Sequence, residues 1–193
     1  GLAAMYASTV PVRGYYSWGK YGLNEQALPY AEGLFTMIQK KKIREVILIA
    51  YWTSYFEQPP ESYVQYGISK DPFAQALMRT VKDLQALGVR VYFQRQAPNY
   101  SVRVPEELAR RSLFGNAPTQ GAITMETLIL DSEPMRLLER ELIAAGVVMI
   151  DTVTALNTPA GIPMVAIDGK SLYGDNHHLS TEGAQRLLPT YRM

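Results

Sequence analysis

The sequence predicts an α/β fold, with three α/β/α layers built around a mostly parallel sheet. Three short apolar runs, at 46–50, 89–93 and 147–150, are typical of strands that are buried on both faces of a parallel sheet. The segments between these runs carry apolar residues at helical spacing, which predicts helices that cover the sheet. The length of 193 residues fits one domain with a substantial core.

Two helices flank the first predicted strand. The first runs from about 28 to 42 and ends in lysines, which suit the negative end of a helix dipole. The second begins at the capping residue Asp71, has Pro72 at its first position and ends at Gly88. Its buried stripe is predicted to contain Phe73, Ala76, Leu77, Val81, Leu84 and Leu87.

The second half of the chain continues the alternation. A short helix is predicted over 105–113, and a longer one begins at the cap Ser132 and closes at Gly146. A strand and tight turn follow over 165–170. The closing helix covers 183–191, and its inward residues are predicted to be Ala184, Leu187 and Leu188.

Composition excludes several classes of function. The net charge of +1 supplies no surplus of cations for a nucleic-acid backbone, so no nucleic-acid partner is expected. The absence of cysteine excludes disulfides and thiolate catalysis. No apolar stretch approaches the length that spans a bilayer.

Both histidines of the chain, His177 and His178, lie next to each other in a polar loop near its end. A histidine that acts as general base needs a carboxylate to fix its tautomer and orientation. Asp175, three positions before His178, is spaced to fold back onto it, and Ser180 is placed to cap the following helix. A simple polar turn is the alternative, because Asp and Asn also favour turns for local reasons.

An aromatic segment follows the first predicted strand. Ligands of open α/β sheets bind at the carboxyl ends of the strands, so Tyr51, Trp52 and Tyr55 are candidate substrate-binding residues. A hydrophobic plug is the alternative role for Trp52 and Tyr55. No metal or cofactor is expected, because Asp175, His177 and His178 alone crowd one loop and no second cluster completes a metal site.

The string Leu-Tyr-x-Asp-x-x-His-Leu-Ser-x-x-Gly-Ala, at 172–184, resembles the last block of the SGNH (GDSL-like) hydrolase domain. More narrowly, it resembles the version fused to the membrane acyltransferase-3 family, whose members O-acylate bacterial surface polysaccharides. The resemblance runs from about Tyr6 to the end of the chain, and includes the segment 51–55 and the proline turns near 98 and 105.

The resemblance implies a function. Asp175 and His178 would be the acid and base of a Ser-His-Asp triad that transfers an acyl group from a donor to a carbohydrate acceptor. It also implies a link to a membrane acyltransferase domain and a location on the periplasmic or extracellular face. Transfer and hydrolysis differ only in the acceptor, so the pattern does not separate acyltransferase from esterase.

The chain departs from the family pattern at the nucleophile. It contains no Gly-Asp-Ser block, and no Asn occupies the oxyanion-hole place near 51–55. We expect that the 193 residues form a single SGNH-like domain without its N-terminal strand and nucleophile block. Natural loss of the serine, or its replacement by an unrecognised Ser or Thr, are the alternatives. A catalytically inactive carbohydrate-binding or interaction module on the same fold is the rival function.

Overall fold

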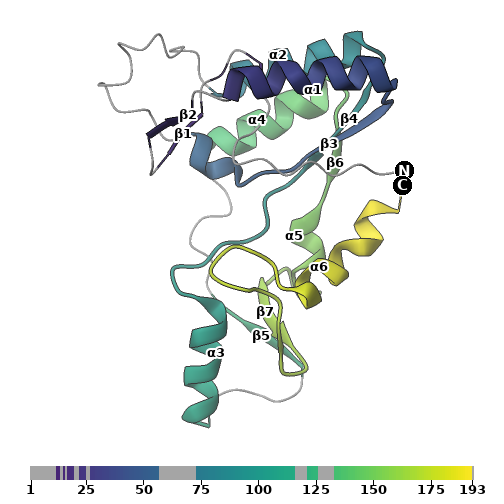
Figure 1. Cartoon of the computed structure of the whole chain (residues 1–193). Helices are drawn as coiled ribbons and strands as arrows, with labels where there is room; N and C mark the ends of the chain where they lie inside the picture. Colours follow the sequence, from purple (N-terminus) through teal and green to yellow (C-terminus); the bar gives the residue numbers. More distant parts are fainter. Residues whose placement is uncertain are drawn as a thin grey trace. The chain divides into compact units, whose positions relative to one another are not determined.

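The protein is described here by a computed structural model, in which the described residues are 12–13, 15, 17–19, 22–24, 27–56, 73–115, 121–125 and 133–192 (Figure 1). The expected caps Asp71, Pro72 and Ser132 lie outside these residues. The chain divides into two compact units. The first unit is drawn from Gly1–Phe93 and Glu133–Val148, and the second unit from Gln94–Ser132 and Met149–Met193.

Three helices of the first unit confirm the predicted ones. They are α1, α2 and α4, which span Ala27–Lys41, Phe73–Ala86 and Glu133–Ala144. The predicted stripe of α2 is buried from Phe73 to Leu84, and Gly88 ends the helix region with a φ of 75°. α2 and α4 are tied together where the Gln85 side chain donates a hydrogen bond of 2.7 Å to the Ala145 carbonyl.

Three strands, β3, β4 and β6, pair in that order and span Glu45–Leu48, Arg90–Gln94 and Val148–Ile150. β3 and β4 are parallel, with Val46 opposite Val91, as predicted for strands joined by a helix. Burial on both faces holds for β4, where Val91, Tyr92 and Phe93 are all buried. It does not hold for β3, which exposes Glu45 and leads into Ile49, 58% exposed.

Strands β1 (Ser17–Gly19) and β2 (Gly22–Asn24) form an antiparallel pair ahead of α1.

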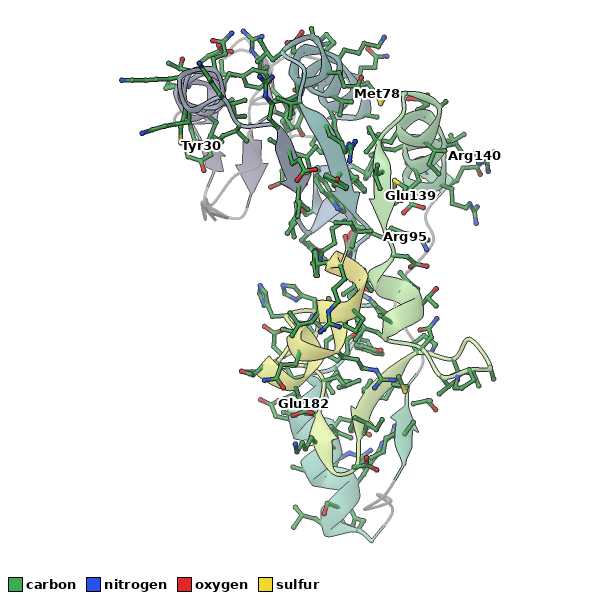
Figure 2. All side chains as sticks on the ribbon, turned by 90° about the vertical axis from the view of Figure 1, so that its right-hand side faces the viewer. Tyr30, Met78, Arg95, Glu139, Arg140 and Glu182 are labelled. Atoms are coloured by element: carbon green, nitrogen blue, oxygen red, sulfur yellow. The ribbon has the colours of Figure 1, made fainter. Side chains whose placement is uncertain are left out.

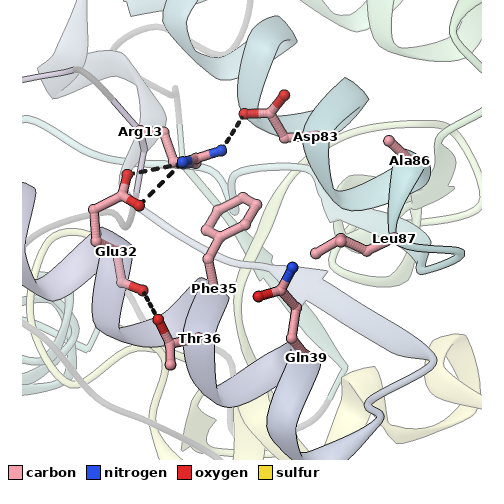
Figure 3. Close-up of a pocket in the computed structure, with 8 residues that line it drawn as sticks. All are labelled: Arg13, Glu32, Phe35, Thr36, Gln39, Asp83, Ala86 and Leu87. Atoms are coloured by element: carbon pink, nitrogen blue, oxygen red, sulfur yellow. Dashed lines mark hydrogen bonds and ion pairs between the residues drawn. The ribbon is translucent and has the colours of Figure 1, made fainter.

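Arg13 joins helices α1 and α2 through ion pairs. Its guanidinium bonds to Glu32 of α1 at 2.8 Å and to Asp83 of α2 at 2.8 Å, and it lies 4.7 Å from the centroid of the Phe35 ring. These side chains line a surface pocket of about 290 Å³ (Figure 3). Because Arg13 is neutralised by two carboxylates, the pocket holds no free cation of its own.

An aromatic cluster forms part of the core of the first unit. Trp52, in the short helix η1 (Trp52–Tyr55), is fully buried and stacks on Phe93 with ring centroids 4.3 Å apart. Phe73, at the start of α2, stacks on Tyr55 at 4.8 Å and meets Tyr15 edge-on at 5.3 Å. Burial raises the pKa of Tyr15 to about 12.

The second unit contains a small antiparallel sheet that the sequence did not predict. Its strands pair in the order β5-β7-β8 and span Ala122–Thr124, Met164–Ile167 and Lys170–Ser171. The predicted tight turn is confirmed at Asp168-Gly169, where both residues have positive φ, 47° and 75°. Such a pair of dihedrals is typical of a two-residue hairpin turn, and Asp-Gly is a preferred sequence for it.

The helices of the second unit are α3, α5 and α6, which span Val104–Leu113, Thr152–Ala155 and Thr181–Leu187, with the short η3 at Leu188–Tyr191. Leu187 is buried as expected. Ala184 and Leu188 are exposed, which corrects the prediction for the closing helix. The predicted apolar stripe assumed one α-helix, but α6 ends at Leu187 and continues as the 3₁₀-helix η3. A 3₁₀-helix has three residues per turn, so residues after Leu187 no longer face the same side.

The ends of β4 and β6 carry polar residues that serve the fold. Arg95, which follows β4 (Figure 2), forms an ion pair of 3.3 Å with Asp151, and its carbonyl accepts a 2.6 Å hydrogen bond from the Thr152 hydroxyl. Asp151 also caps α5 by accepting from the backbone N–H groups of Val153 and Thr154. Within the described part of the chain, no helix has the length and apolarity that a membrane crossing requires.

Candidate functional site

The loop at 172–180 in the second unit carries both histidines, and backbone hydrogen bonds close it on itself. The Ser180 N–H donates to the Leu172 carbonyl at 3.0 Å, which brings the two ends of the loop together. Inside this ring, the Gly174 N–H donates to the His178 carbonyl at 2.8 Å. The loop therefore has a fixed backbone that presents its polar side chains.

Ser180 fixes the loop from behind, as the sequence predicts. Its hydroxyl oxygen accepts from the Gly183 N–H at 3.1 Å, which makes Ser180 the N-cap of α6. The same hydroxyl donates to the Ser171 carbonyl at 2.7 Å. One side chain thus joins the strand before the loop to the helix after it.

Asp175 uses its two carboxylate oxygens for different purposes. Oδ1 accepts from the backbone N–H groups of His177 at 2.8 Å and of His178 at 2.7 Å. Oδ2 lies 2.7 Å from Nδ1 of the His178 ring. The contact expected between Asp175 and His178 is therefore present, and the carboxylate that orients the ring is itself held by the backbone.

The hydrogen bond to Asp175 assigns the proton on His178. A carboxylate accepts and does not donate, so Nδ1 of His178 carries hydrogen, which leaves Nε2 of the neutral ring as an acceptor. The His178 side chain is 72% exposed. Its Nε2 is therefore placed to take a proton from a group that approaches from outside the loop.

The charge of Asp175 is stabilised in this arrangement. Burial raises the pKa of Asp175, but the hydrogen bonds from the His177 N–H, the His178 ring and the His178 N–H outweigh it and hold the pKa well below its usual range. The carboxylate is therefore ionised at neutral pH. This is the state that stabilises an imidazolium on His178.

His177 has a different environment from its neighbour. Its Nδ1 lies 2.8 Å from the Asn176 side-chain oxygen, and its side chain is 28% exposed. Burial and, second, the charge of His178 lower the pKa of His177, while Asp175 opposes this shift. The rings of His177 and His178 have centroids 3.9 Å apart and are tilted by 41°.

The segment that leads into α3, together with the first residue of α3, anchors the tip of the loop, which sequence reasoning missed. The Tyr100 N–H donates to the Asn176 carbonyl at 2.9 Å, and the Val104 N–H donates to the Asp175 carbonyl at 3.2 Å. The Tyr100 ring also meets the Tyr173 ring edge-on, with centroids 5.0 Å apart. No sequence signal could have revealed backbone contacts between residues more than seventy positions apart.

Gly183 is a second residue that the sequence analysis passed over. A Cβ at this position would lie 2.1 Å from the Leu172 carbonyl oxygen, closer than any real Cβ contact. The first turn of α6 therefore approaches the base of the loop through glycine. A signal did exist, because glycine is disfavoured inside a helix unless close approach or an unusual φ requires it.

Asp175, His177 and His178 form the one group of potential metal ligands found among the described residues, and their ligand atoms lie within 4.8 Å of one another. Asp175 already accepts two backbone hydrogen bonds and one ring hydrogen bond. Both carboxylate oxygens of Asp175 are therefore already engaged within the loop.

The aromatic candidates belong to the first unit, and Asp175 and His178 belong to the second. Trp52 is fully buried against Phe93, which favours its alternative role as a hydrophobic plug and argues against direct contact with a substrate. Tyr51 is 38% exposed. Tyr55 is half-buried and stacks on a neighbouring ring. Tyr51 and Tyr55 therefore keep surface on which a ligand could pack.

The comparison with solved structures gives the fold. The periplasmic domain of a lipopolysaccharide acetyltransferase from Salmonella ser. Paratyphi A superposes with a TM-score of 0.65 at 16% identity, over 93% of this chain and 67% of that one. The OSK domain of Drosophila Oskar gives a TM-score of 0.37 at 12% identity, over 76% of this chain and 59% of that one. The first match confirms the predicted α/β fold class.

Sequence comparisons give the family. No curated protein sequence matches the chain with significance. The profile of the SGNH domain that is fused to AT3 domains matches residues 3–192, which is nearly the whole chain. The Asp-His pair described above lies within this matched span. The chain therefore belongs to the family of SGNH domains fused to AT3 domains.

Proposed function

We propose that this chain is the acyl-transfer domain of a carbohydrate O-acyltransferase, and that Asp175 and His178 supply the acid and base of its Ser-His-Asp triad. The observation that carries the proposal is the 2.7 Å contact between Asp175 Oδ2 and His178 Nδ1, on a ring that is otherwise 72% exposed. Membership in an acyltransferase-linked family supports the same reading.

In the proposed reaction, a serine hydroxyl attacks the carbonyl carbon of the acyl donor while His178 Nε2 takes the hydroxyl proton. The donor's leaving group departs with that proton, and the acyl group stays on the serine as an ester. His178 then takes a proton from the acceptor hydroxyl, which attacks the ester, and returns that proton to the serine oxygen as it departs. Asp175 holds the ring in place and stabilises its cation in both steps.

We propose that the serine of the triad is not one of these 193 residues, which contain no Gly-Asp-Ser block. A protein that supplies this block together with the Asp-His pair would carry the complete triad. The chain by itself would then bind substrate without completing the covalent step. Water in place of the sugar hydroxyl would turn the same chemistry into ester hydrolysis.

The proposed acceptor is a cell-surface carbohydrate on the periplasmic or extracellular side, and the acyl donor reaches the site from a linked membrane acyltransferase domain. Two comparisons support this: the family is fused to AT3 domains, and the lipopolysaccharide acetyltransferase domain shares the fold. Tyr51 and Tyr55 are the proposed carbohydrate contacts, because aromatic rings with exposed surface pack against apolar faces of ligands.

Fluorophosphonate labelling, read by intact-mass spectrometry, tests the mechanism. The 193-residue chain should gain no adduct. The intact parent protein should gain one adduct on its serine, and His178→Ala should slow this labelling by at least about a hundredfold. Glu182→Gln is the control and should label like the wild type, because this half-buried carboxylate on α6 (Figure 2) pairs with Lys170 and not with either histidine. Equal labelling of the parent and its His178→Ala variant would contradict the triad.

The rival proposal is a catalytically inactive carbohydrate-binding module on the same fold, which the missing Gly-Asp-Ser block favours. Under this proposal, His178→Ala leaves glycan binding unchanged and no variant of the parent protein shows turnover. Isothermal titration with the acceptor polysaccharide separates the two, because a module requires Tyr51 or Tyr55 for binding and does not require His178.

A further inference from the structure

The His178 ring is held at one edge by a single side-chain hydrogen bond, from Nδ1 to Asp175. The side chain is 72% exposed, so most of its surface meets no protein atom that could restrict it. A hydrogen bond at one ring nitrogen fixes that nitrogen, but it permits the ring to pivot about the bond. A second contact is needed to hold Nε2 in a fixed direction.

The ring of His177 supplies this second contact. Its centroid lies 3.9 Å from that of His178, which is van der Waals contact between two aromatic faces, and the planes are tilted by 41°. Pivoting of His178 toward this side is blocked by the neighbouring ring. The contact involves a ring face and not a hydrogen bond, so it constrains orientation without competing for Nε2.

His177 is itself held in place by hydrogen bonds, so its ring can restrict the movement of the His178 ring. Its N–H donates to Asp175 Oδ1 at 2.8 Å, and its Nδ1 lies 2.8 Å from the Asn176 side-chain oxygen. The Asn176 carbonyl is in turn held by the Tyr100 N–H at 2.9 Å. Only 28% of the His177 side chain is exposed, against 72% for His178. The anchored ring therefore supports the exposed one.

We propose that His177 is a positioning residue, whose ring face keeps His178 aligned with Asp175 and directs Nε2 toward the reacting hydroxyl. The proposal rests on the proposed function for the role of His178 as base, but the alignment itself can be measured without any turnover. A neutral neighbouring ring also places no like charge beside the cation that forms on His178 during proton transfer. Burial lowers the pKa of His177, which keeps that neighbouring ring neutral when His178 is charged.

Proton NMR of the 193-residue chain tests the alignment. The Nδ1–H proton of His178, sheltered by Asp175, should give a downfield resonance, and Asp175→Asn identifies it by removing or shifting it. In His177→Ala the exchange of this proton with water should be at least about tenfold faster, because the ring pivots away from Asp175. In His177→Phe, which keeps an aromatic face, exchange should remain within about threefold of the wild type.

Two outcomes would overturn the proposal. Wild-type exchange in His177→Ala would mean that the ring of His177 does not restrain His178. Equally fast exchange in the Phe and Ala variants would mean that the aromatic face is not the restraint. Should His177→Ala fail to fold by circular dichroism, His177→Leu takes its place, because leucine fills space without an aromatic face.

The parent protein links the alignment to the reaction. We expect His177→Ala to slow fluorophosphonate labelling of the serine by about ten- to a hundredfold, since small misplacements of a catalytic group have costs of that order. His177→Phe should restore most of the rate. Failure of the proposed function appears differently, as labelling that does not depend on His178 while the exchange of its Nδ1–H still depends on His177.

Discussion

At the scale of single residues, the site depends on how one carboxylate divides its hydrogen bonds. Asp175 Oδ1 fixes the backbone of the loop and Oδ2 fixes the ring of His178. Because three donors converge on this carboxylate, its charge is stabilised and its orientation has no freedom. Replacing it changes the tautomer of a histidine as well as the shape of a loop.

Asp175→Asn in the intact protein is the first prediction at this scale. The amide no longer favours the tautomer with hydrogen on Nδ1 of His178. The other tautomer carries its hydrogen on Nε2, which then cannot accept the proton of the nucleophile. We expect kcat to fall by about 10³- to 10⁴-fold. Steady-state acyl transfer measures this, with Glu182→Gln as the matched carboxylate change. A loss below about tenfold would contradict the role of Asp175.

The lowered pKa of His177 predicts a pH dependence of stability. The unfolded chain binds a proton at His177 near pH about 6.5, and the folded chain binds it at lower pH. The contribution of His177 to the free energy of unfolding is therefore fully present above about pH 6.5. It is lost as the pH falls through the lower pKa that His177 has in the folded chain. Urea unfolding at pH 7.5 and 5.0 should show a larger loss in the wild type than in His177→Phe. Equal losses of unfolding free energy in the two proteins would contradict the lowered pKa of His177.

Two buried hydroxyls give a third residue-scale prediction. The OH groups of Tyr100 and Tyr173 are buried, and among the described residues neither makes a hydrogen bond of normal geometry. Burial raises the pKa of both, and the two hydroxyls also act on each other's pKa. Removing both removes a desolvation cost, so the double variant Tyr100→Phe with Tyr173→Phe should be neutral or more stable by about 1 kcal/mol. Urea unfolding measures it. Destabilisation would show that the hydroxyls are bonded to groups outside the described residues or to each other.

At the scale of elements, α6 determines how the loop is held. Ser180 caps the helix and bonds to the strand before the loop, and the first turn of α6 lies against the Leu172 carbonyl. This approach is possible because position 183 has no Cβ. The helix and the loop are therefore positioned as one piece, and a change in one displaces the other.

Gly183→Ala tests this close approach. The added Cβ would lie 2.1 Å from a backbone oxygen that cannot move away cheaply, so the variant should lose about 2–3 kcal/mol of stability. Gly33→Ala is the matched control, because Gly33 is exposed in α1 and its Cβ would meet nothing within 4 Å. That change should add about 0.5–1 kcal/mol. Equal effects of the two substitutions in urea unfolding would contradict the close approach.

At the scale of the whole molecule, the chain crosses between its two compact units within strands. The crossings at 93/94 and 148/149 fall inside β4 and β6. Each of these two strands therefore contributes residues to both units. This favours the expected single domain, which remains a prediction.

Cooperative unfolding tests the single domain. Tryptophan fluorescence reports Trp18 and the buried Trp52, both of the first unit, and the NMR signals of His177 and His178 report the second. The two urea transitions should coincide, with midpoints that agree within error. Gly183→Ala, a change in the second unit, should lower both midpoints together. A transition that shifts for one probe alone would show two independent domains.

Local sequence determined much of this protein. The places of α1, α2 and α4, the Asp168-Gly169 turn and the Ser180 cap follow from periodicity and from residues that adopt particular dihedrals or accept particular hydrogen bonds. The contact between Asp175 and His178 follows in the same way, because three positions in a tight loop suffice to bring them together. The catalytic role assigned to that pair remains a prediction.

The tertiary structure decided what depends on residues far apart in the chain. The burial of Trp52, the antiparallel sheet of the second unit and the exposure of Leu188 each result from packing partners that no local pattern names. The same holds for the N–H groups of Tyr100 and Val104, which anchor the loop. The spacing of apolar residues shows which side of a helix or strand is apolar. It does not show which other element covers that side, because any apolar surface of the chain can bury it.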